Sequence, residues 1–137
     1  MTALRARVLS PGEAEGPVLR LTEPLSFWGS FDPQTGRIID VHHPENGAEL
    51  AGRILVMAES RGSGSAPGGI AEAIRLQTAP SGIVLARDDV NLAMGSLVAA
   101  LLYGRACPVV TLEEDDFARA AAAARIAIRT DGTVTLG

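Results

Sequence analysis

Apolar residues occur in short runs along this chain, and Gly, Pro, Asn and Asp residues separate the runs. A short apolar run between turn residues is typical of a buried strand, whereas a longer stretch with helical spacing is typical of a helix. The longest apolar stretch ends at Gly104, a residue type common at helix C-termini. The pattern predicts helices at residues 70–76, 90–103 and about 112–125, and strands at residues 4–9, 17–21, 25–31, 37–41, 54–58, 83–86, 108–111, 126–130 and 133–136.

The order of these elements indicates the class of fold. Strands come first, strands that alternate with helices follow, and a hairpin ends the chain. Nine candidate strands in this order, for an expected count of about eight, predict a mixed α/β domain with a barrel-like or sandwich sheet and helices on its outside. Residues 10–16 are expected to form a turn-rich loop. No repeat and no long linker interrupts the chain, so we expect a single domain over residues 1–137, with a proper hydrophobic core.

Turn and capping residues mark several element ends. Asp88 or Asp89 is expected to cap the second helix. Thr111 and Glu114 have the spacing of a capping box ahead of the Ala-rich third helix. An Asp-Gly pair at 131–132, between two alternating strands, is the strongest hairpin signal in the chain.

Composition narrows the class of protein. Apolar residues make up 47% of the chain, which is typical of a globular protein. The net charge is −4 and the sequence contains no lysine, which argues against a nucleic-acid-binding surface. The first residues lack the apolar segment of a signal peptide, and no stretch approaches the length of a membrane span. We therefore expect a cytoplasmic protein without membrane contact.

Cysteine and histidine, which bind metals and take part in catalysis, are few in this chain. Cys107 is the only cysteine, so no internal disulfide can form, and its apolar surroundings predict a buried thiol. An iron–sulfur cluster requires about three or four cysteines. His42 and His43 are adjacent, so on a strand they would point to opposite faces and could not share a metal ion. We expect structural roles for both histidines.

The segment Arg61-Gly62-Ser63-Gly64-Ser65 stands between a predicted strand and a predicted helix. Glycines let the backbone approach a ligand closely, and a helix N-terminus offers N–H groups to an anion. A serine can act as a base only when oriented N–H groups or a cation hold its alkoxide. The segment matches no dinucleotide, P-loop or hydrolase motif. The residues alone therefore leave two interpretations open, a candidate site and a flexible Gly/Ser loop.

Several motifs along the chain occur together in one known family. They are Leu25-Ser26-Phe27-Trp28-Gly29, Asp32-Pro33 with Thr35-Gly36-Arg37-Ile38-Ile39-Asp40, His43-Pro44, Gly52-Arg53-Ile54-Leu55-Val56, Arg61-Gly62-Ser63 with Ser65, and Tyr103-Gly104-Arg105 with Pro108-Val109-Val110. Together, over residues 17–112, they resemble the swivel domain of aconitase X. The resemblance implies an α/β fold of the aconitase-like swivelling β/β/α type, with a barrel-like mixed sheet and flanking helices. In that family the swivel domain is either fused to a catalytic domain or is a separate small subunit, which a chain ending at Gly137 resembles.

The resemblance implies a hydro-lyase in which this chain is active only with a large subunit. The large subunit would carry an iron–sulfur cluster or iron as a Lewis acid, so no cofactor is expected on this chain. The swivel domain would supply the serine that takes the Cα proton of a small-molecule substrate. Ser63 matches this catalytic base by its place between strand and helix, and Ser65 is the fallback. Arg61, Gly62, Gly64 and Ser65 would bind the substrate, with Arg61 orienting a carboxylate or phosphate.

The resemblance leaves the substrate open. Family members dehydrate cis-3-hydroxy-L-proline in bacteria and mevalonate 5-phosphate in archaea. The Ala-, Arg- and Gly-rich composition is typical of GC-rich bacterial genomes and favours cis-3-hydroxy-L-proline. The alternatives are the small subunit of a mevalonate 5-phosphate dehydratase and a non-catalytic barrel that binds a small molecule or a protein. A serine hydrolase would need His42 or His43 beside Ser63.

Five other residues of the motifs have expected roles outside the chemistry. Asp40, His43 and Pro44 are expected to hold the exit of a hairpin, through a hydrogen bond between Asp40 and a histidine. Trp28 is expected in an aromatic core, with lining of a cleft by Ser26 and Trp28 as the alternative.

Overall fold

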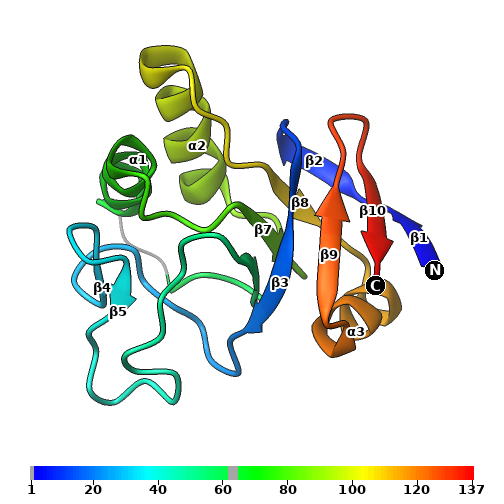
Figure 1. The fold of residues 1–137 in the computed structure, drawn as a ribbon, viewed down its shortest axis with the longest axis horizontal. Coiled ribbons are helices and arrows are strands. Elements are labelled where there is room, and N and C mark those ends of the chain that lie inside the picture. The colour runs from blue at the N-terminus through cyan, green and yellow to red at the C-terminus, as the bar shows by residue number, and fades with distance from the viewer. Residues whose placement is uncertain (1, 62–64) are drawn as a thin grey trace.

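The computed structural model describes residues 2–61 and 65–137, and these form one eight-stranded sheet, a small two-stranded sheet and three helices (Figure 1). The helices are α1 (Ala66–Leu76), α2 (Val90–Tyr103) and α3 (Glu114–Ala122). The large sheet contains β1 (Thr2–Arg5), β2 (Arg7–Ser10), β3 (Ala14–Arg20), β6 (Ile54–Val56), β7 (Gly82–Leu85), β8 (Val109–Thr111), β9 (Arg125–Ile128) and β10 (Thr133–Leu136). The small sheet pairs β4 (Phe31–Asp32) with β5 (Arg37–Ile38).

The large sheet curls into a nearly closed barrel. Its strand order is β1-β10-β9-β3-β6-β7-β8-β2, so its two edge strands are neighbours in the sequence. The predicted single strand over 4–9 is therefore wrong: the chain breaks at Ala6, whose N–H donates to the carbonyl oxygen of Gly132 over 2.8 Å. The first half pairs with β10 and the second half with β8. One continuous strand could not pair with both β10 and β8 at opposite edges of the sheet. The break at Ala6 divides the segment into β1 at one edge and β2 at the other.

Strands β3, β6, β7 and β8 run parallel and form the centre of the sheet. Side chains of β6 alternate between two apolar clusters: Leu55 belongs to the cluster that includes α1 and α2, and Ile54 and Val56 belong to the cluster of the barrel interior. Strands β6, β7 and β8 are buried at every position, and parallel strands buried on both faces read as continuous apolar runs, which explains why the sequence pattern located these three. In Figure 1, α1 and α2 lie on one side of the sheet, and α3 lies below β9 and β10.

Helix α1 begins earlier than predicted. The expected start was residue 70, but residues 66–69 are already helical, so they do not belong to the preceding loop. Pro67 lies in the first turn, where a fixed φ and a missing N–H are tolerated. A side chain at Gly69 would place its Cβ 2.0 Å from the carbonyl oxygen of Phe27. The glycine is thus required because the segment around Phe27 packs directly against the helix.

Other predicted boundaries also shift. Strand β3 starts at Ala14, within the expected loop over 10–16, because Ala14 pairs with Ile128 of β9. Strand β5 stops at Ile38, and Val41 is 77% exposed. The third helix is shorter than 112–125 and has no capping box, because the Thr111 hydroxyl donates to Asp88 instead.

The second helix and the terminal hairpin agree with the sequence-based prediction. Asp89 caps α2 by accepting a hydrogen bond from the Leu92 N–H over 3.1 Å. Gly104 ends α2 in the left-handed conformation at φ 66°. Gly132 has φ 94° in the turn between β9 and β10, and its N–H donates to the Arg129 carbonyl oxygen.

Candidate functional site

The carboxyl ends of the parallel strands meet at one edge of the sheet, which we call the site edge. It consists of residues 57–61 after β6, 86–89 after β7 and 111–113 at and after β8. Helices α2 and α3 begin at this edge, and residues 62–64, which lie outside the described part of the chain, connect it to α1. In open parallel α/β sheets, ligands bind outside the carboxyl ends of the strands. The predicted site segment, residues 61–65, starts at this edge.

Two consecutive residues anchor the start of that segment. The hydroxyl of Ser60 donates a hydrogen bond to the carboxylate of Asp89, which also caps α2. The N–H of Arg61 donates to the carbonyl oxygen of Leu25 over 3.0 Å. The sequence analysis did not single out Ser60. A hydroxyl at the end of one parallel strand, facing an N-cap carboxylate after the next strand, is the signal that could have found it.

The predicted site residues fall partly within the described structure. Gly62, Ser63 and Gly64 lie outside the described residues, so the assignment of Ser63 as the base stays a prediction. Arg61 is exposed, and its guanidinium forms no ion pair with any described residue. Ser65 is also exposed and stands at the N-cap of α1. Arg61 and Ser65 therefore flank residues 62–64, one with a cation and the other with a helix N-terminus.

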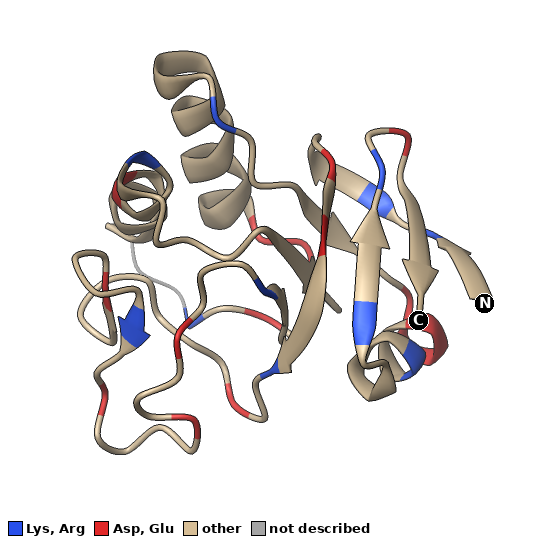
Figure 2. Ribbon diagram, viewed as in Figure 1, with Lys and Arg blue, Asp and Glu red and all other residues tan. Residues whose placement is uncertain are grey.

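Two ion pairs lie along the rest of the site edge, and Figure 2 shows where acidic and basic residues fall on the ribbon. Arg87 forms an ion pair with Glu59 at 3.4 Å. Asp88 forms an ion pair with Arg7 and accepts a hydrogen bond from the Thr111 hydroxyl at 3.0 Å. Among the described residues of the site edge, Arg87 is thus held in an ion pair and Arg61 is not, and a guanidinium is a group that binds carboxylates and phosphates.

His43 has a structural role, as expected. It is buried, its Nε2 lies 3.1 Å from the carbonyl oxygen of Glu23, and its Nδ1 accepts the N–H of Glu45 over 3.1 Å. An Nδ1 that accepts leaves the proton on Nε2, so the ring is a neutral donor and both nitrogens are occupied. The expected Asp40–histidine hydrogen bond is made by the backbone N–H of His42 and not by an imidazole ring.

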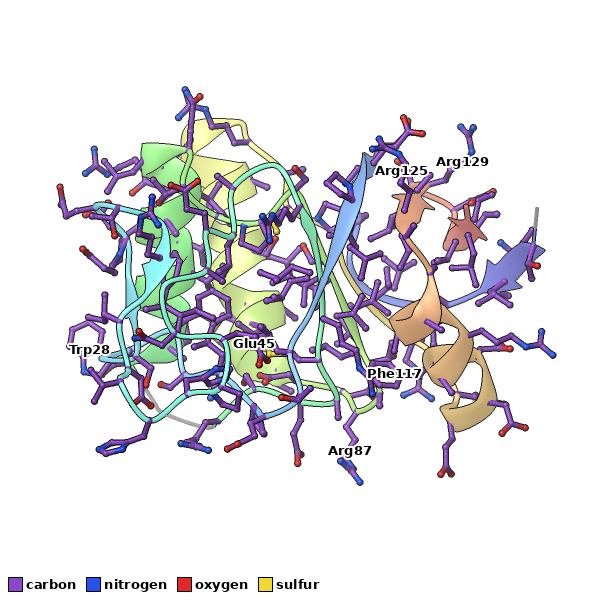
Figure 3. The ribbon with its side chains drawn as sticks, turned by 60° about the horizontal axis from the view of Figure 1, so that its bottom comes forward. Trp28, Glu45, Arg87, Phe117, Arg125 and Arg129 are labelled. Carbon is purple, nitrogen blue, oxygen red and sulfur yellow. The ribbon has the colours of Figure 1, made fainter. Side chains whose placement is uncertain are left out.

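Trp28 does not belong to the core, which corrects the expectation of an aromatic core at that position. Its side chain is 60% exposed, whereas Phe27 and Phe31 are buried and pack edge-to-face with centroids 5.2 Å apart. In Figure 3, which brings the site edge forward, Trp28 and Arg87 both lie on the outside of the molecule. The hydroxyl of Ser26 is engaged by the backbone of Trp28, so Ser26 stabilises this turn.

The described residues do not fit a metal cluster. Cys107 is buried, as predicted, and its thiol lies 3.3 Å from the Pro80 carbonyl oxygen. Burial raises the pKa of this thiol to about 12, whereas a metal ligand must be a thiolate. Within residues 2–61 and 65–137, no group of three or more His, Cys, Asp or Glu side chains could hold a metal ion. In the same part of the chain, no helix has the length and apolar character needed to cross a membrane.

Fold and site together define a small α/β barrel domain with a candidate site at the carboxyl edge of its parallel strands. The sequence profile of the aconitase X swivel domain family matches residues 3–136, and the chain belongs to this family. The solved structure of Thermococcus kodakaraensis aconitase X in its holo-form superposes with a TM-score of 0.81 at 26% identity, covering 100% of this chain and 99% of that one. The family and fold that the motifs indicated are thereby confirmed.

Curated relatives fall into two groups. The chain is 39% identical over 128 residues to the cis-3-hydroxy-L-proline dehydratase of Hypocrea jecorina, which covers 92% of this chain and 22% of that protein. It is 39% identical over 95 residues to the phosphomevalonate dehydratase small subunit of Methanothermobacter thermautotrophicus, which covers 69% of this chain and 72% of the subunit. The chain thus spans about a fifth of the first relative and most of the second.

Proposed function

We propose that this chain is the swivel subunit of a dehydratase and that it supplies a serine base to a large subunit. The observation that carries the proposal is that β6 ends at the site edge and that Arg61 and Ser65, the described residues on either side of 62–64, lie between β6 and α1. The anchoring of Ser60 and Arg61 supports it, because a base must be held in a defined place relative to its substrate. Relatives described as small subunits support the requirement for a second chain.

In this proposal, Ser63 takes a proton from the substrate carbon, and Ser65 is the alternative base. The N-terminus of α1 follows directly, and its partial positive charge favours a nearby alkoxide. The glycines at 62 and 64 let backbone N–H groups approach the same oxygen. Arg61 binds a substrate carboxylate in a bidentate manner. The proposal places the iron–sulfur cluster or iron on the large subunit, and no step assigned to this chain passes through it.

For the substrate, we propose cis-3-hydroxy-L-proline. Its single carboxylate matches the one exposed cation that the described part of the site edge leaves without an ion pair, Arg61. A phosphorylated substrate such as mevalonate 5-phosphate carries more negative charge and would require further cations from the large subunit. Relatives of both substrate groups reach 39% identity, so the test has to include both compounds.

The test is to co-express this chain with a candidate cysteine-containing large subunit and to assay dehydration of both compounds. We expect activity only when both chains are present, and a loss of about 10²-fold or more in Ser63→Ala. Ser65→Ala is assayed in parallel, and Ser81→Ala, which precedes β7 at the opposite edge, is the matched control. Loss in Ser65→Ala alone would transfer the role to that residue. Full activity in both variants would contradict a serine base, and failure of the chains to associate would favour a free-standing binding domain.

A further inference from the structure

Helix α2 is apolar on two opposite sides. One side packs into the domain, with Leu92, Ala93, Gly95, Ser96 and Ala99 buried. The other side is exposed along a stripe with helical spacing, and we call it the α2 face: Val90, Met94, Leu97, Val98 and Leu101. Exposed fractions range from 42% at Val98 to 84% at Leu101. The helix contains no Asp, Glu, Lys or Arg, as its uncoloured ribbon shows (Figure 2).

Such a helix is unusual on the surface of an isolated domain. A surface helix normally carries charged residues on the side opposite the core, whereas a helix that is apolar all round is buried in its complete assembly. A contiguous exposed apolar patch marks a site of protein or membrane interaction. The α2 face is therefore the surface of this domain that a partner protein would desolvate with the greatest gain.

A groove extends the α2 face to the site edge. Its volume is about 320 Å³, and it is lined by Leu9, Asp88, Asp89, Val90, Ala93, Met94, Leu97 and Val98. Asp89 in this lining is the residue that also accepts the Ser60 hydrogen bond at the start of residues 61–65. An apolar centre with a charged rim is the usual anatomy of a protein–protein interface. A partner seated in the groove would therefore also meet the segment that carries the proposed base.

We infer that the α2 face and its groove dock the large subunit of the dehydratase. This inference rests on the proposed function and names the surface through which it operates. Two observations favour the large subunit over a second copy of this chain. The groove reaches the site edge at Asp88 and Asp89, where the proposed function requires the large subunit. In the Hypocrea relative, moreover, the matching segment is 22% of a longer protein, so the same domain is part of one chain with a much larger body.

The test uses the full chain with Met94→Asp and Leu97→Asp combined, because both residues are exposed and neither belongs to the proposed site. The matched control is Val41→Asp, which changes an exposed apolar residue far from α2 in the sequence. Affinity for the large chain is measured by calorimetry, and the fold of each variant alone is checked by thermal unfolding. We expect the Kd to rise by about 10²-fold or more in the double variant and by less than about 3-fold in the control.

The outcomes separate this inference from the proposed function. A double variant that is folded and binds the large chain as the wild type does would overturn the docking surface, while the function would stand. The wild-type chain could form a homodimer that becomes monomeric in the double variant, while the double variant still binds the large chain. This result would assign the α2 face to a second copy of this chain and would also overturn the inference. A wild-type complex that is inactive on both substrates would contradict the proposed function alone. The docking surface would still be tested by the change in Kd between the wild type and the double variant. If the wild-type chain does not associate with the large chain, both the proposed function and the docking surface are contradicted.

Discussion

The hydroxyl of Ser60 donates a hydrogen bond to Asp89, and this contact joins the start of residues 61–65 to the N-terminus of α2. Asp89 uses its other carboxylate oxygen to cap the helix at Leu92. One carboxylate therefore holds both the segment that carries the proposed base and the helix that carries the proposed docking face. A change at Asp89 should affect stability through the helix cap and activity through the position of Ser60.

Replacement of Asp89 separates these two effects. Asp89→Ala removes the cap and the Ser60 contact, and we expect the free energy of unfolding to fall by about 1–2 kcal/mol. Asp89→Asn retains a good capping oxygen, and it should be clearly more stable than Asp89→Ala. Ser60→Ala keeps the helix cap and loses only the hydrogen bond to Asp89. It should therefore lower kcat of the complex by a larger factor than it lowers the folding equilibrium constant. Urea unfolding of the three variants measures the contribution of the cap. Equal stability of Asp89→Ala and Asp89→Asn would contradict it.

Two neighbouring glycines in α1 provide a matched pair. Gly69→Ala would bring a Cβ to 2.0 Å from the Phe27 carbonyl oxygen, so the helix or the segment at Phe27 must shift. We expect a loss of stability of about 1–3 kcal/mol or more from this overpacking. A Cβ at Gly68 meets no atom within 4 Å, and Gly68→Ala should raise helix stability by up to about 1 kcal/mol. Thermal unfolding of both variants is sufficient, and a similar effect of the two changes would contradict the close approach.

The two histidines should differ sharply despite being adjacent. His43→Ala removes a buried ring with hydrogen bonds to Glu23 and Glu45, and leaves the N–H of Glu45 without that acceptor. We expect His43→Ala to lower the free energy of unfolding by about 1–3 kcal/mol. The side chain of His42 is exposed, and His42→Ala should change stability by less than about 0.5 kcal/mol. Chemical unfolding of both variants provides the measurement. If His42→Ala were the more damaging change, the structural role of His43 would be wrong.

Cys107 should be inert in the native protein and should make stability depend on alkaline pH. Burial raises its pKa from 9.0 to about 12, so the folded state keeps the proton that the unfolded state loses. The unfolded chain therefore binds fewer protons above pH 9, and the free energy of unfolding falls as pH rises. The contribution is fully present below pH 9 and is lost towards pH 12, with a slope of up to about 1.4 kcal/mol per pH unit.

Cys107→Ala isolates this contribution, because other groups that titrate in the same range are common to both proteins. The difference in unfolding free energy between wild type and variant should shift in favour of the variant between pH 9 and 11. A disulfide exchange reagent at pH 8 should label Cys107 only after unfolding, since the thiolate is the reactive form. Rapid labelling of the folded chain would show that the thiol is accessible, contrary to its burial.

Local signals in the sequence determined several elements of this protein. Helix α2 has the ends predicted for it, because Asp89 and Gly104 act on the backbone within one turn of the helix. The turn at Gly132 was also readable, since glycine adopts positive φ at low cost. The continuous apolar runs located the central strands because parallel strands are buried on both faces. The motifs, taken together, determined the family, which the match over residues 3–136 confirms.

The tertiary structure alone decided what depends on distant partners. The break at Ala6 follows from barrel closure, in which β1 pairs with β10 more than a hundred residues later. The contact of Ser60 with Asp89 joins residues 29 positions apart, and it exists because β6 and β7 are adjacent parallel strands. The exposure of the α2 face could not be predicted from the sequence either, since the pattern of a helix that is apolar all round does not indicate which side packs against the core. A local pattern records what a residue prefers, whereas strand pairing and packing decide which residues it meets.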